Sequence, residues 1–397
     1  MKVLITGGAG FIGSHLANKL AKDNATVTVL DNLSKQIHGD DPYNKSALFL
    51  SLDRRVRFIE GSVADRGVLE RAMEGQDAIV HLAAETGTGQ SMYEVSHYVD
   101  VNVSGTGLML DILVKNSANT VKKVVVASSR AIYGEGKYRS PELGIVYPGA
   151  REEKHMLAGQ FDHLCPKSGV PMECLPTDEE SKIHPSSVYG ITKYDQELMV
   201  MTVCRSIGIG ASALRYQNVY GPGQSLSNPY TGILSIFSTR IKNGNEISVF
   251  EDGLESRDFV YIDDVVDATA AALTSPKAND HVFGIGSGER TPVIDVANRL
   301  RELYGSELPV KVTGAFRLGD IRHNYADLTL PRELLGFEPK VKFNEGIARF
   351  AAWVDGQEVQ EDRYEKSIVE MKARGLYQAS QAAANAGSVG NAGKAAA

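Results

Sequence analysis

The sequence predicts an α/β protein with a doubly wound parallel sheet and a smaller C-terminal lobe. Short apolar runs alternate with helical patterns from residue 2 to about residue 130. The runs are continuously apolar rather than alternating, which is typical of strands buried on both faces of a parallel sheet. The 397 residues, 43% of them hydrophobic, suffice for one large α/β domain with an attached lobe, or for two domains.

The alternating region contains five predicted strands and three predicted helices. Alternation of this kind indicates right-handed βαβ units, which place helices on both faces of one sheet. The strands are expected over Lys2–Thr6, Thr26–Asp31, Val56–Glu60, Ala78–Ala83 and Lys123–Ser128, and the helices over Gly13–Lys22, Arg66–Met73 and Val99–Val114.

The alternation ends after Tyr133. Residues 136–182 are rich in Pro, Gly, Glu and His without a sustained period, so we expect an insertion that lacks a long helix. Regular structure resumes with a helix, a strand and a turn-rich region containing four further helices. These are predicted over Ser187–Arg205, Ala211–Arg215, Gly232–Lys242, Asp263–Leu273, Val293–Tyr304 and Asn344–Trp353.

The chain is therefore divided into residues 1–215 with the insertion, a lobe formed mainly by residues 216–372, and a tail over 373–397. Whether the chain crosses back from the lobe to the sheet is left open. The tail becomes rich in Ala, Gly, Ser and Asn. Such a composition buries too little surface to offset its ordering entropy, so the tail is expected to be disordered.

Composition excludes several classes of protein. A net charge of −7 argues against a general nucleic-acid or membrane-surface binder, which needs a basic face. No apolar run reaches the roughly 18 residues of a membrane span, and the start lacks the features of a secretory signal. Three scattered cysteines form no disulfide framework. The cytoplasm is the expected compartment.

A glycine-rich turn joins the first strand to the first helix. Gly7, Gly10 and Gly13 form G-x-x-G-x-x-G, which permits a tight turn and lets the backbone approach a pyrophosphate at the helix N-terminus. The alternative is a turn that binds no ligand. The strand before it, the helix after it and an acid at the end of the second strand favour a dinucleotide site.

The acid is Asp31, 18 residues after Gly13. A carboxylate there accepts hydrogen bonds from a ribose 2′-hydroxyl and repels a 2′-phosphate. No arginine follows in Asn32-Leu33-Ser34, so NAD is favoured over NADP. The fourth strand ends in His81-Leu82-Ala83-Ala84, whose small residues would let a cofactor pass. His81 fits a buried strand end equally well.

Tyr189 and Lys193 lie four residues apart and hence on one face of a helix. A free tyrosine has a pKa near ~10, and a nearby lysine or nicotinamide cation favours the phenolate. Tyr189 could then accept a proton while a carbinol loses hydride. Tyr-x-x-x-Lys is common by chance. It gains weight from Ser128-Ser129, where a hydroxyl could orient the reacting oxygen.

These motifs together resemble the extended short-chain dehydrogenase/reductase family, specifically its nucleotide-sugar epimerases and dehydratases. The resemblance runs from Lys2 to about Trp353. It rests on Thr-Gly-Gly-Ala-Gly-Phe-Ile-Gly at 6–13, Asp31 to Ser34, His81 to Ala84, Asn-Val-Ser-Gly-Thr at 102–106, Ser128-Ser129 with Tyr133-Gly134, Tyr189 with Lys193, Asn-Val-Tyr-Gly-Pro-Gly at 218–223, Arg-Asp-Phe-Val-Tyr-Ile-Asp-Asp at 257–264 and Arg-Leu-Gly-Asp at 317–320.

The resemblance implies a Rossmann domain and a role for each matching residue. Ser129, Tyr189 and Lys193 would form the catalytic triad. The cofactor would be contacted by Tyr189, Lys193 and residues of the strand ends, namely Gly7, Gly10, Phe11, Ile12, Gly13, Asp31, Asn32, Ser62, Val63, Leu82, Ala83, Ala84 and Asn102. A homodimer through the helices near Val99–Val114 and Ser187–Arg205 is also implied.

The sugar nucleotide would be contacted by Thr86, Ser129, Asn218, Arg257, Arg317 and Asp320. The arginines would lie at its diphosphate, since guanidinium forks suit diphosphate oxygens. The alternative for Arg257 is a surface ion pair with Asp258 or Glu255, and for Asn218 a turn position.

Departures from the family pattern narrow the range of reactions that the protein could catalyse. The 4,6-dehydratases carry Asp-Glu after the catalytic hydroxyl residue, whereas this chain has Arg130-Ala131, which argues against dehydration. Ser62 replaces an aspartate that the family often has near the adenine. The insertion lies between two predicted catalytic residues, so its expected role is that of a lid or of a wall that selects the substrate. Its Cys165, Cys174, His155 and His163 lack zinc-site spacing, so no metal is expected.

The insertion, Ser129 to Gly134 and Gln224 to Tyr230 most resemble the dTDP-L-rhamnose 4-epimerase branch. The expected function is therefore an NAD-dependent nucleotide-sugar 4-epimerase acting on a dTDP-6-deoxyhexose such as dTDP-L-rhamnose through a transient 4-keto sugar. The alternatives are an NAD(P)-dependent keto-sugar reductase or another nucleotide-sugar-modifying member, and a non-catalytic protein that senses the cofactor.

Overall fold

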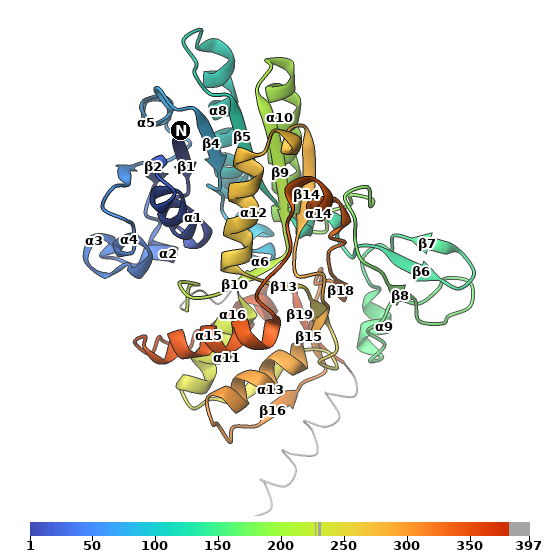
Figure 1. Ribbon diagram of the computed structural model, residues 1–397. Coiled ribbons are helices and arrows are strands. Elements are labelled where there is room, and N and C mark those ends of the chain that lie inside the picture. The colour runs from blue at the N-terminus through green and yellow to red at the C-terminus, as the bar shows by residue number, and fades with distance from the viewer. Residues whose placement is uncertain (227, 229–231, 381–397) are drawn as a thin grey trace, which may run out of the picture.

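The computed structural model describes residues 1–226, 228 and 232–380. Its largest element is a seven-stranded parallel sheet in the order β14-β9-β5-β4-β1-β2-β3 (Figure 1). The strands are β1 (Lys2–Thr6), β2 (Thr26–Asp31), β3 (Arg57–Glu60), β4 (Ala78–His81), β5 (Lys123–Ser129), β9 (Gly210–Tyr216) and β14 (His281–Ile285). The predicted doubly wound α/β fold is confirmed.

Both faces of this sheet are covered by helices. Helices α1 (Phe11–Lys22) and α12 (Ile262–Thr274) cover one face, and α5 (Arg66–Met73), α8 (Gly105–Lys115) and α10 (Val188–Ser206) cover the other. Side chains alternate along β1: Val3 and Ile5 enter the first core, and Leu4 enters the second. Burial on both faces explains why the strand sequences are continuously apolar.

The chain does cross back from the lobe to the sheet. β14 pairs in parallel with β9, with Phe283 opposite Leu214, and α12 packs against α1. The sequence did not predict a strand over residues 281–285. As an outer strand, β14 is exposed or half-buried at its first two residues, so its apolar run is short.

The remaining lobe contains the predicted helices α11 (Ile233–Lys242), α13 (Val293–Leu303) and α15 (Phe343–Asp355), with α14 (Thr329–Leu335) and α16 (Tyr364–Ala373) in addition. Its short strands are β10 (Asn218–Tyr220), β11 (Ile247–Val249), β12 (Ser256–Arg257), β13 (Phe259–Tyr261), β15 (Thr291–Pro292), β16 (Val310–Val312), β17 (Ala315–Arg317), β18 (His323–Asn324) and β19 (Tyr377–Ala379).

The insertion forms its own small antiparallel sheet, which projects from the main body in Figure 1. Its strands are β6 (Tyr138–Ser140), β7 (Gly144–Val146) and β8 (Glu173–Cys174), and its helix α9 (Glu153–Leu157) has five residues. The short helix agrees with the expectation that this segment lacks a long one.

Short helical turns complete the chain: α2 (Lys35–His38), α3 (Pro42–Lys45), α4 (Ala47–Leu50), α6 (Thr88–Ser91), α7 (Val95–Tyr98), η1 (Val99–Ser104), η2 (Arg130–Tyr133) and η3 (Pro276–Ala278). The helix predicted over Val99–Val114 is divided, because η1 is π-helical and α8 begins at Gly105.

The tail prediction was wrong for its first residues. Tyr377–Ala379 forms β19, which pairs with β17, and the Tyr377 ring packs on Phe250 with centroids 5.9 Å apart. Backbone pairing and ring contacts order this stretch despite its polar composition. Residues 381–397, and residues 227 and 229–230 of the Gln224–Tyr230 motif, lie outside the described part of the chain. Among the described helices, none combines the length and apolarity needed to cross a membrane.

Candidate active site

A cavity of about 470 Å³ lies at the carboxyl ends of the sheet strands and extends to the lobe. It is where a doubly wound fold binds its ligands. The predicted site residues that line it come from the glycine loop, the start of α1, the strand ends and the loops after them, α10 and β10. They are Gly7, Gly10, Phe11, Ile12, Gly13, Asp31, Asn32, Ser62, Val63, Leu82, Ala83, Ala84, Thr86, Ser129, Tyr189, Lys193 and Asn218.

The three glycines of the loop meet different constraints. Gly7 has a φ of +67°, and a Cβ there would lie 2.8 Å from the Ala83 backbone. A Cβ on Gly13 would lie 2.3 Å from the Gly7 carbonyl oxygen. At Gly10 the same atom meets only the Gly7 oxygen, at 3.3 Å. Gly7 and Gly13 are thus needed for the turn, and Gly10 keeps the cavity side open.

Asp31 ties the second strand to this loop. Its Oδ2 accepts a hydrogen bond from the Ala9 N–H at 3.0 Å, and its Oδ1 accepts one from Leu33 N–H at 2.9 Å. The buried carboxylate therefore fixes the loop and still lines the cavity. Remaining lone pairs on its oxygens can accept from a ribose hydroxyl.

His81 lies fully buried behind the cavity. Its Nδ1 is 2.7 Å from Thr6 Oγ1, and its Nε2 is 2.9 Å from Thr106 Oγ1. Burial and the nearby Lys193 lower the pKa of His81 to about 3, so the ring is neutral. Of its two interpretations, the structure favours the buried strand end.

Tyr189 stands in the first turn of α10, beside the end of β5. Ser187 caps this helix, because its Oγ accepts the Gly190 N–H at 3.1 Å. A Cβ on Gly190 would lie 2.7 Å from the Ala131 carbonyl oxygen, so the helix packs directly on η2. This packing brings the Tyr189 hydroxyl within hydrogen-bonding reach of Ser129.

The surroundings of Tyr189 have opposite effects on its pKa. Burial raises the pKa of Tyr189, whereas the hydrogen bond with Ser129 and the positive charge of Arg130 lower it. Burial also lowers the pKa of Lys193 to about 7, against the effect of Glu197. The Lys193 ammonium donates to Gln196 Oε1 at 2.7 Å.

Arg130 is a site residue that the sequence reasoning missed. It was noted only because it replaces an acid, yet it directly follows Ser129 and lines the cavity. Burial and repulsion from Arg257 lower the pKa of Arg130 to about 10, so it remains cationic at neutral pH. Within the described chain, no hydrogen bond or ion pair is formed by its guanidinium. The signal in the sequence was a cation beside Ser129, the serine that is predicted to be catalytic.

Four buried polar atoms of cavity-lining residues lack a partner among the described residues. They are Ser128 Oγ, Gln217 Oε1, Asn218 Oδ1 and Gln224 Oε1, all shielded from solvent. Buried polar groups are nearly always paired, so such atoms indicate a ligand or ordered water. Ser128 lies at the end of β5, and the other three lie between the end of β9 and the loop that follows β10.

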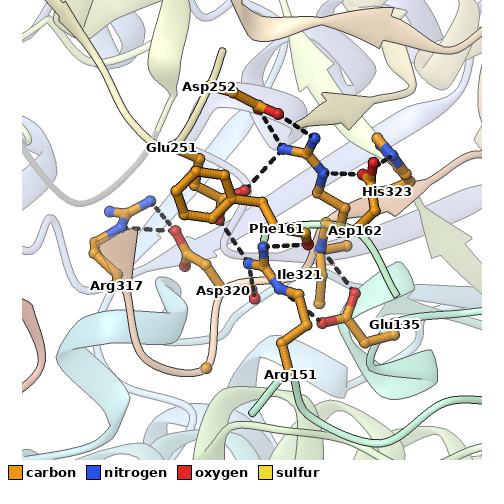
Figure 2. Close-up of polar contacts among 12 residues, drawn as sticks. Glu135, Arg151, Phe161, Asp162, Glu251, Asp252, Arg317, Asp320, Ile321 and His323 are labelled. Atoms are coloured by element: carbon orange, nitrogen blue, oxygen red, sulfur yellow. Dashed lines mark hydrogen bonds and ion pairs between the residues drawn. The ribbon is translucent and has the colours of Figure 1, made fainter. Parts of the chain in front are cut away.

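Four predicted residues lie outside the cavity lining. The Asn102 amide is used by the protein itself, since it bonds the Glu85 backbone at 2.7 and 3.1 Å and Thr192 Oγ1 at 2.9 Å. It therefore braces the cavity wall. Arg317 forms an ion pair with Asp320 at 2.6 Å (Figure 2).

Arg257 makes no ion pair within the described chain, contrary to the alternative of a surface pair with Asp258 or Glu255. Three of its hydrogen bonds go to the carbonyl oxygens of Ser256, Ile321 and Arg322. Arg130, Arg257 and Arg317 each lie close enough to Asp320 to interact with it electrostatically. Burial would raise the pKa of Asp320, but Arg317, Arg257 and Arg151 hold it below its ordinary value.

These residues fit NAD. The open side of Gly10 and the free N–H groups at the start of α1 suit a pyrophosphate, and Asp31 suits a ribose. Tyr189, Lys193 and the unpartnered Ser128 Oγ lie in the same cavity. Beyond them, the arginines around Asp320 form a second region that suits an anionic ligand.

Comparison with known proteins identifies the family. The model of the NAD dependent epimerase/dehydratase family matches residues 3–149 and 166–286. The dTDP-L-rhamnose 4-epimerase of Burkholderia thailandensis is 39% identical over 356 residues, which are 89% of this chain and 94% of the relative. A putative UDP-glucose 4-epimerase of Methanocaldococcus jannaschii is 30% identical, with 89% and 98% covered.

Solved structures agree with this assignment. The UDP-glucose 4-epimerase of Thermotoga maritima with UDP-glucose is 32% identical, with a TM-score of 0.71 and 89% of this chain and 99% of that chain covered. The UDP-glucuronic acid 4-epimerase of Bacillus cereus, in complex with UDP-glucuronic acid and NAD, is 25% identical, with a TM-score of 0.69 and the same shares covered.

The glycine loop yields a test with its own control. Gly10→Ala is expected to change the free energy of unfolding by less than ~1 kcal/mol, because the φ of −71° suits any residue. It is expected to weaken NAD binding by about tenfold, because the methyl group obstructs the pyrophosphate. Gly13→Ala should instead destabilise the fold by about 1–3 kcal/mol, because its Cβ meets backbone.

Thermal unfolding and calorimetric NAD titration measure these effects. Unchanged NAD affinity in a stable Gly10→Ala protein would show that the loop does not hold the pyrophosphate.

Proposed function

Because the chain belongs to the NAD-dependent epimerase/dehydratase family, we propose that it is a nucleotide-sugar 4-epimerase acting on a dTDP-6-deoxyhexose such as dTDP-L-rhamnose. The observation that carries the reaction is that Ser129, Tyr189 and Lys193 line one cavity with the glycine loop. The substrate rests on the 39% identical relative of that name.

When bound, NAD supplies reversible hydride transfer, which turns the sugar C4 carbinol into a ketone and back. Tyr189 takes the proton of the C4 hydroxyl as hydride leaves, and returns it in the second half-reaction. Ser129 holds the reacting oxygen, since it lines the same cavity as Tyr189 and is close enough to influence the pKa of Tyr189. The 4-keto sugar rotates within the cavity between the two steps, so hydride returns to the opposite face of C4.

Arg130 supports the tyrosine electrostatically. Its unpaired guanidinium lowers the pKa of Tyr189 and so favours the phenolate that accepts the proton. The same position carries an acid in the 4,6-dehydratases. With Arg130 and Ala131 there, no acid–base pair is available for elimination of water, which favours epimerisation over dehydration.

The sugar nucleotide is proposed to lie between the cofactor and the arginine region. Thr86 and the unpartnered Asn218 Oδ1 line the part of the cavity that is proposed to hold the sugar. Arg257 and Arg317, with Asp320 beside them, would receive the diphosphate. The Arg257 guanidinium is held by carbonyls rather than by acids and keeps its full charge for an anion, whereas Arg317 is paired with Asp320.

Two other functions are weaker candidates. A keto-sugar reductase would use the same residues but would consume reduced cofactor in stoichiometric amounts. A cofactor-sensing protein would have no need for Ser129, Tyr189 and Lys193, whose joint presence in the cavity argues against it.

A homodimer is proposed through η1, α8 and α10. The helices over Val99–Val114 and Ser187–Arg205 carry exposed apolar side chains, including Val99, Val114, Ile191 and Leu198. A monomer in sedimentation velocity at micromolar concentration would contradict it.

The three cysteines are unpaired, which agrees with the cytoplasm as the proposed compartment.

The direct test is proton NMR of the purified protein with dTDP-L-rhamnose and no added cofactor. A second anomeric signal that rises to a plateau, without net redox change, is expected. Tyr189→Phe should lower turnover by about 10²-fold or more and spare NAD binding, because only the acid–base group is lost. Absence of any product from the wild-type protein would refute this substrate, and near-normal turnover of Tyr189→Phe would refute the mechanism.

Removing the charge of Arg130 should shift the pH dependence of turnover. Arg130→Met raises the pKa of Tyr189, and the tyrosine must be deprotonated to act as the base. The low-pH limb of kcat is therefore expected to move to higher pH, by about one unit.

Arg130→Lys is the matched control, because it keeps the charge and should leave the limb near its wild-type position. A profile for Arg130→Met that coincides with the wild-type profile would show that Arg130 does not act on the tyrosine.

A further inference from the structure

A cluster of charges joins the insertion to the C-terminal lobe (Figure 2). Its arginines and Glu251 are buried, and Asp162 and Asp252 lie at its more exposed edge. At its centre is Arg322, whose side chain is 1% exposed. Its guanidinium donates to Asp162 Oδ1 at 2.8 Å, to Glu251 Oε2 at 2.9 Å and to both oxygens of Asp252. Asp162 belongs to the insertion, and the two other acids belong to the lobe.

A second arginine enters the cluster from the insertion. Arg151 donates to Glu251 Oε1 at 2.7 Å, to the Phe161 carbonyl oxygen at 3.1 Å and to the Asp320 carbonyl oxygen at 2.8 Å. Its Nε lies 3.6 Å from Glu135, and Glu135 accepts the Arg322 backbone N–H at 2.8 Å. Figure 2 shows Arg151 between Glu135 and Glu251.

Glu251 therefore bridges the two guanidinium groups with its two oxygens. Its backbone has a φ of +49°, a left-handed conformation that non-glycine residues rarely adopt, and its side chain is buried. Such strain persists only where the surroundings hold it. The two ion pairs supply that restraint.

The segment held by this cluster carries the proposed diphosphate site. Arg151 bonds the carbonyl of Asp320, and Glu135 bonds the N–H of Arg322. The next carbonyl oxygens along the same segment, those of Ile321 and Arg322, accept from the Arg257 guanidinium at 2.8 and 3.1 Å. The position of Arg257 thus depends on a backbone that the insertion fixes.

We propose that Arg151 and Glu251 are positioning residues for the nucleoside diphosphate, and that the insertion is a fixed wall of the sugar-nucleotide site. They act through the backbone of residues 320–322, whose carbonyls orient Arg257. This inference rests on the proposed function, which places the diphosphate at Arg257. A mobile lid would not keep such a cluster buried against the lobe in every turnover, because breaking buried ion pairs is costly.

The test is calorimetric titration of the NAD-bound protein with thymidine diphosphate and uridine diphosphate. Arg151→Met is expected to weaken binding of the preferred nucleotide by about tenfold or more. Its loss lets residues 320–322 shift, and a small displacement of Arg257 weakens its contacts with the diphosphate. KM should rise to a similar extent. Turnover at saturating substrate should change by less than about twofold, because the groups at C4 are untouched.

Glu251→Gln is the second variant, since Arg151→Met removes a buried cation from beside Glu251 and Glu135 and is the variant more prone to misfold. It keeps the shape of the bridge without its charge and should weaken binding by about threefold or more. Arg139→Met is the matched control. Arg139 lies in the same insertion and pairs at 3.2 Å with Glu173 on the surface, so its loss should leave binding within about twofold.

The outcomes separate the two claims. Wild-type affinity in either folded variant would overturn the positioning role while leaving the proposed function intact. A fall in turnover with unchanged nucleotide affinity would also overturn it, because that result assigns the cluster to the chemistry. A wild-type protein that binds neither nucleotide would overturn the proposed function, and this inference with it.

Discussion

The site depends on how closely α10 approaches the end of β5. No side chain separates Gly190 from the Ala131 carbonyl oxygen, and a Cβ there would lie only 2.7 Å from it. The contact is reinforced from beneath by Arg215 of β9, which bonds both oxygens of Glu197 on α10 at 2.6 and 3.0 Å and the Tyr133 hydroxyl at 2.7 Å. A buried, fully hydrogen-bonded pair of this kind fixes geometry more than it adds stability. Tyr189 consequently meets Ser129 at the mouth of the cofactor cavity.

Local sequence patterns predicted the elements whose structure is decided locally. The helix Arg66–Met73 has the predicted bounds, because Asp65 caps its start by accepting from Val68 N–H. The strand β14 escaped prediction, because its place is set by α12 carrying the chain back to the sheet. The tail segment β19 escaped for a related reason, since a distant strand supplies its partners.

The candidate site also contains some residues that local sequence predicts and others whose surroundings depend on tertiary structure. The glycine loop, Asp31 and the tyrosine–lysine pair follow from spacing along the chain, and the structure brings them into one cavity. The surroundings of Arg257 required tertiary structure, because its partners are backbone carbonyls 64 and 65 residues away. Arg130 was visible in the sequence only as a missing acid. Its proximity to Tyr189 depends on the packing of α10 on η2.

The insertion changes the electrostatics of the substrate side. Arg151 and Arg322 neutralise Glu251 and Asp252, while burial and Glu251 raise the pKa of the neighbouring Glu255 to about 8. These acids are therefore compensated or protonated near neutral pH. Arg130 and Arg257, which form no ion pair within the described chain, keep their charge for an anionic ligand. The protein thus combines a cofactor cavity defined by short motifs with a proposed substrate region defined by contacts between distant segments.

The central claim is that hydride leaves C4 of the sugar and returns to C4 within one cavity. It is tested most directly with dTDP-L-rhamnose carrying deuterium at C4, incubated with the protein in ordinary water and followed by NMR. The account predicts that the epimerised product retains deuterium at C4, because the label stays with the enzyme between the two half-reactions. Loss of the label to solvent at the rate of epimerisation would contradict it, because the inversion would then proceed by proton abstraction from carbon.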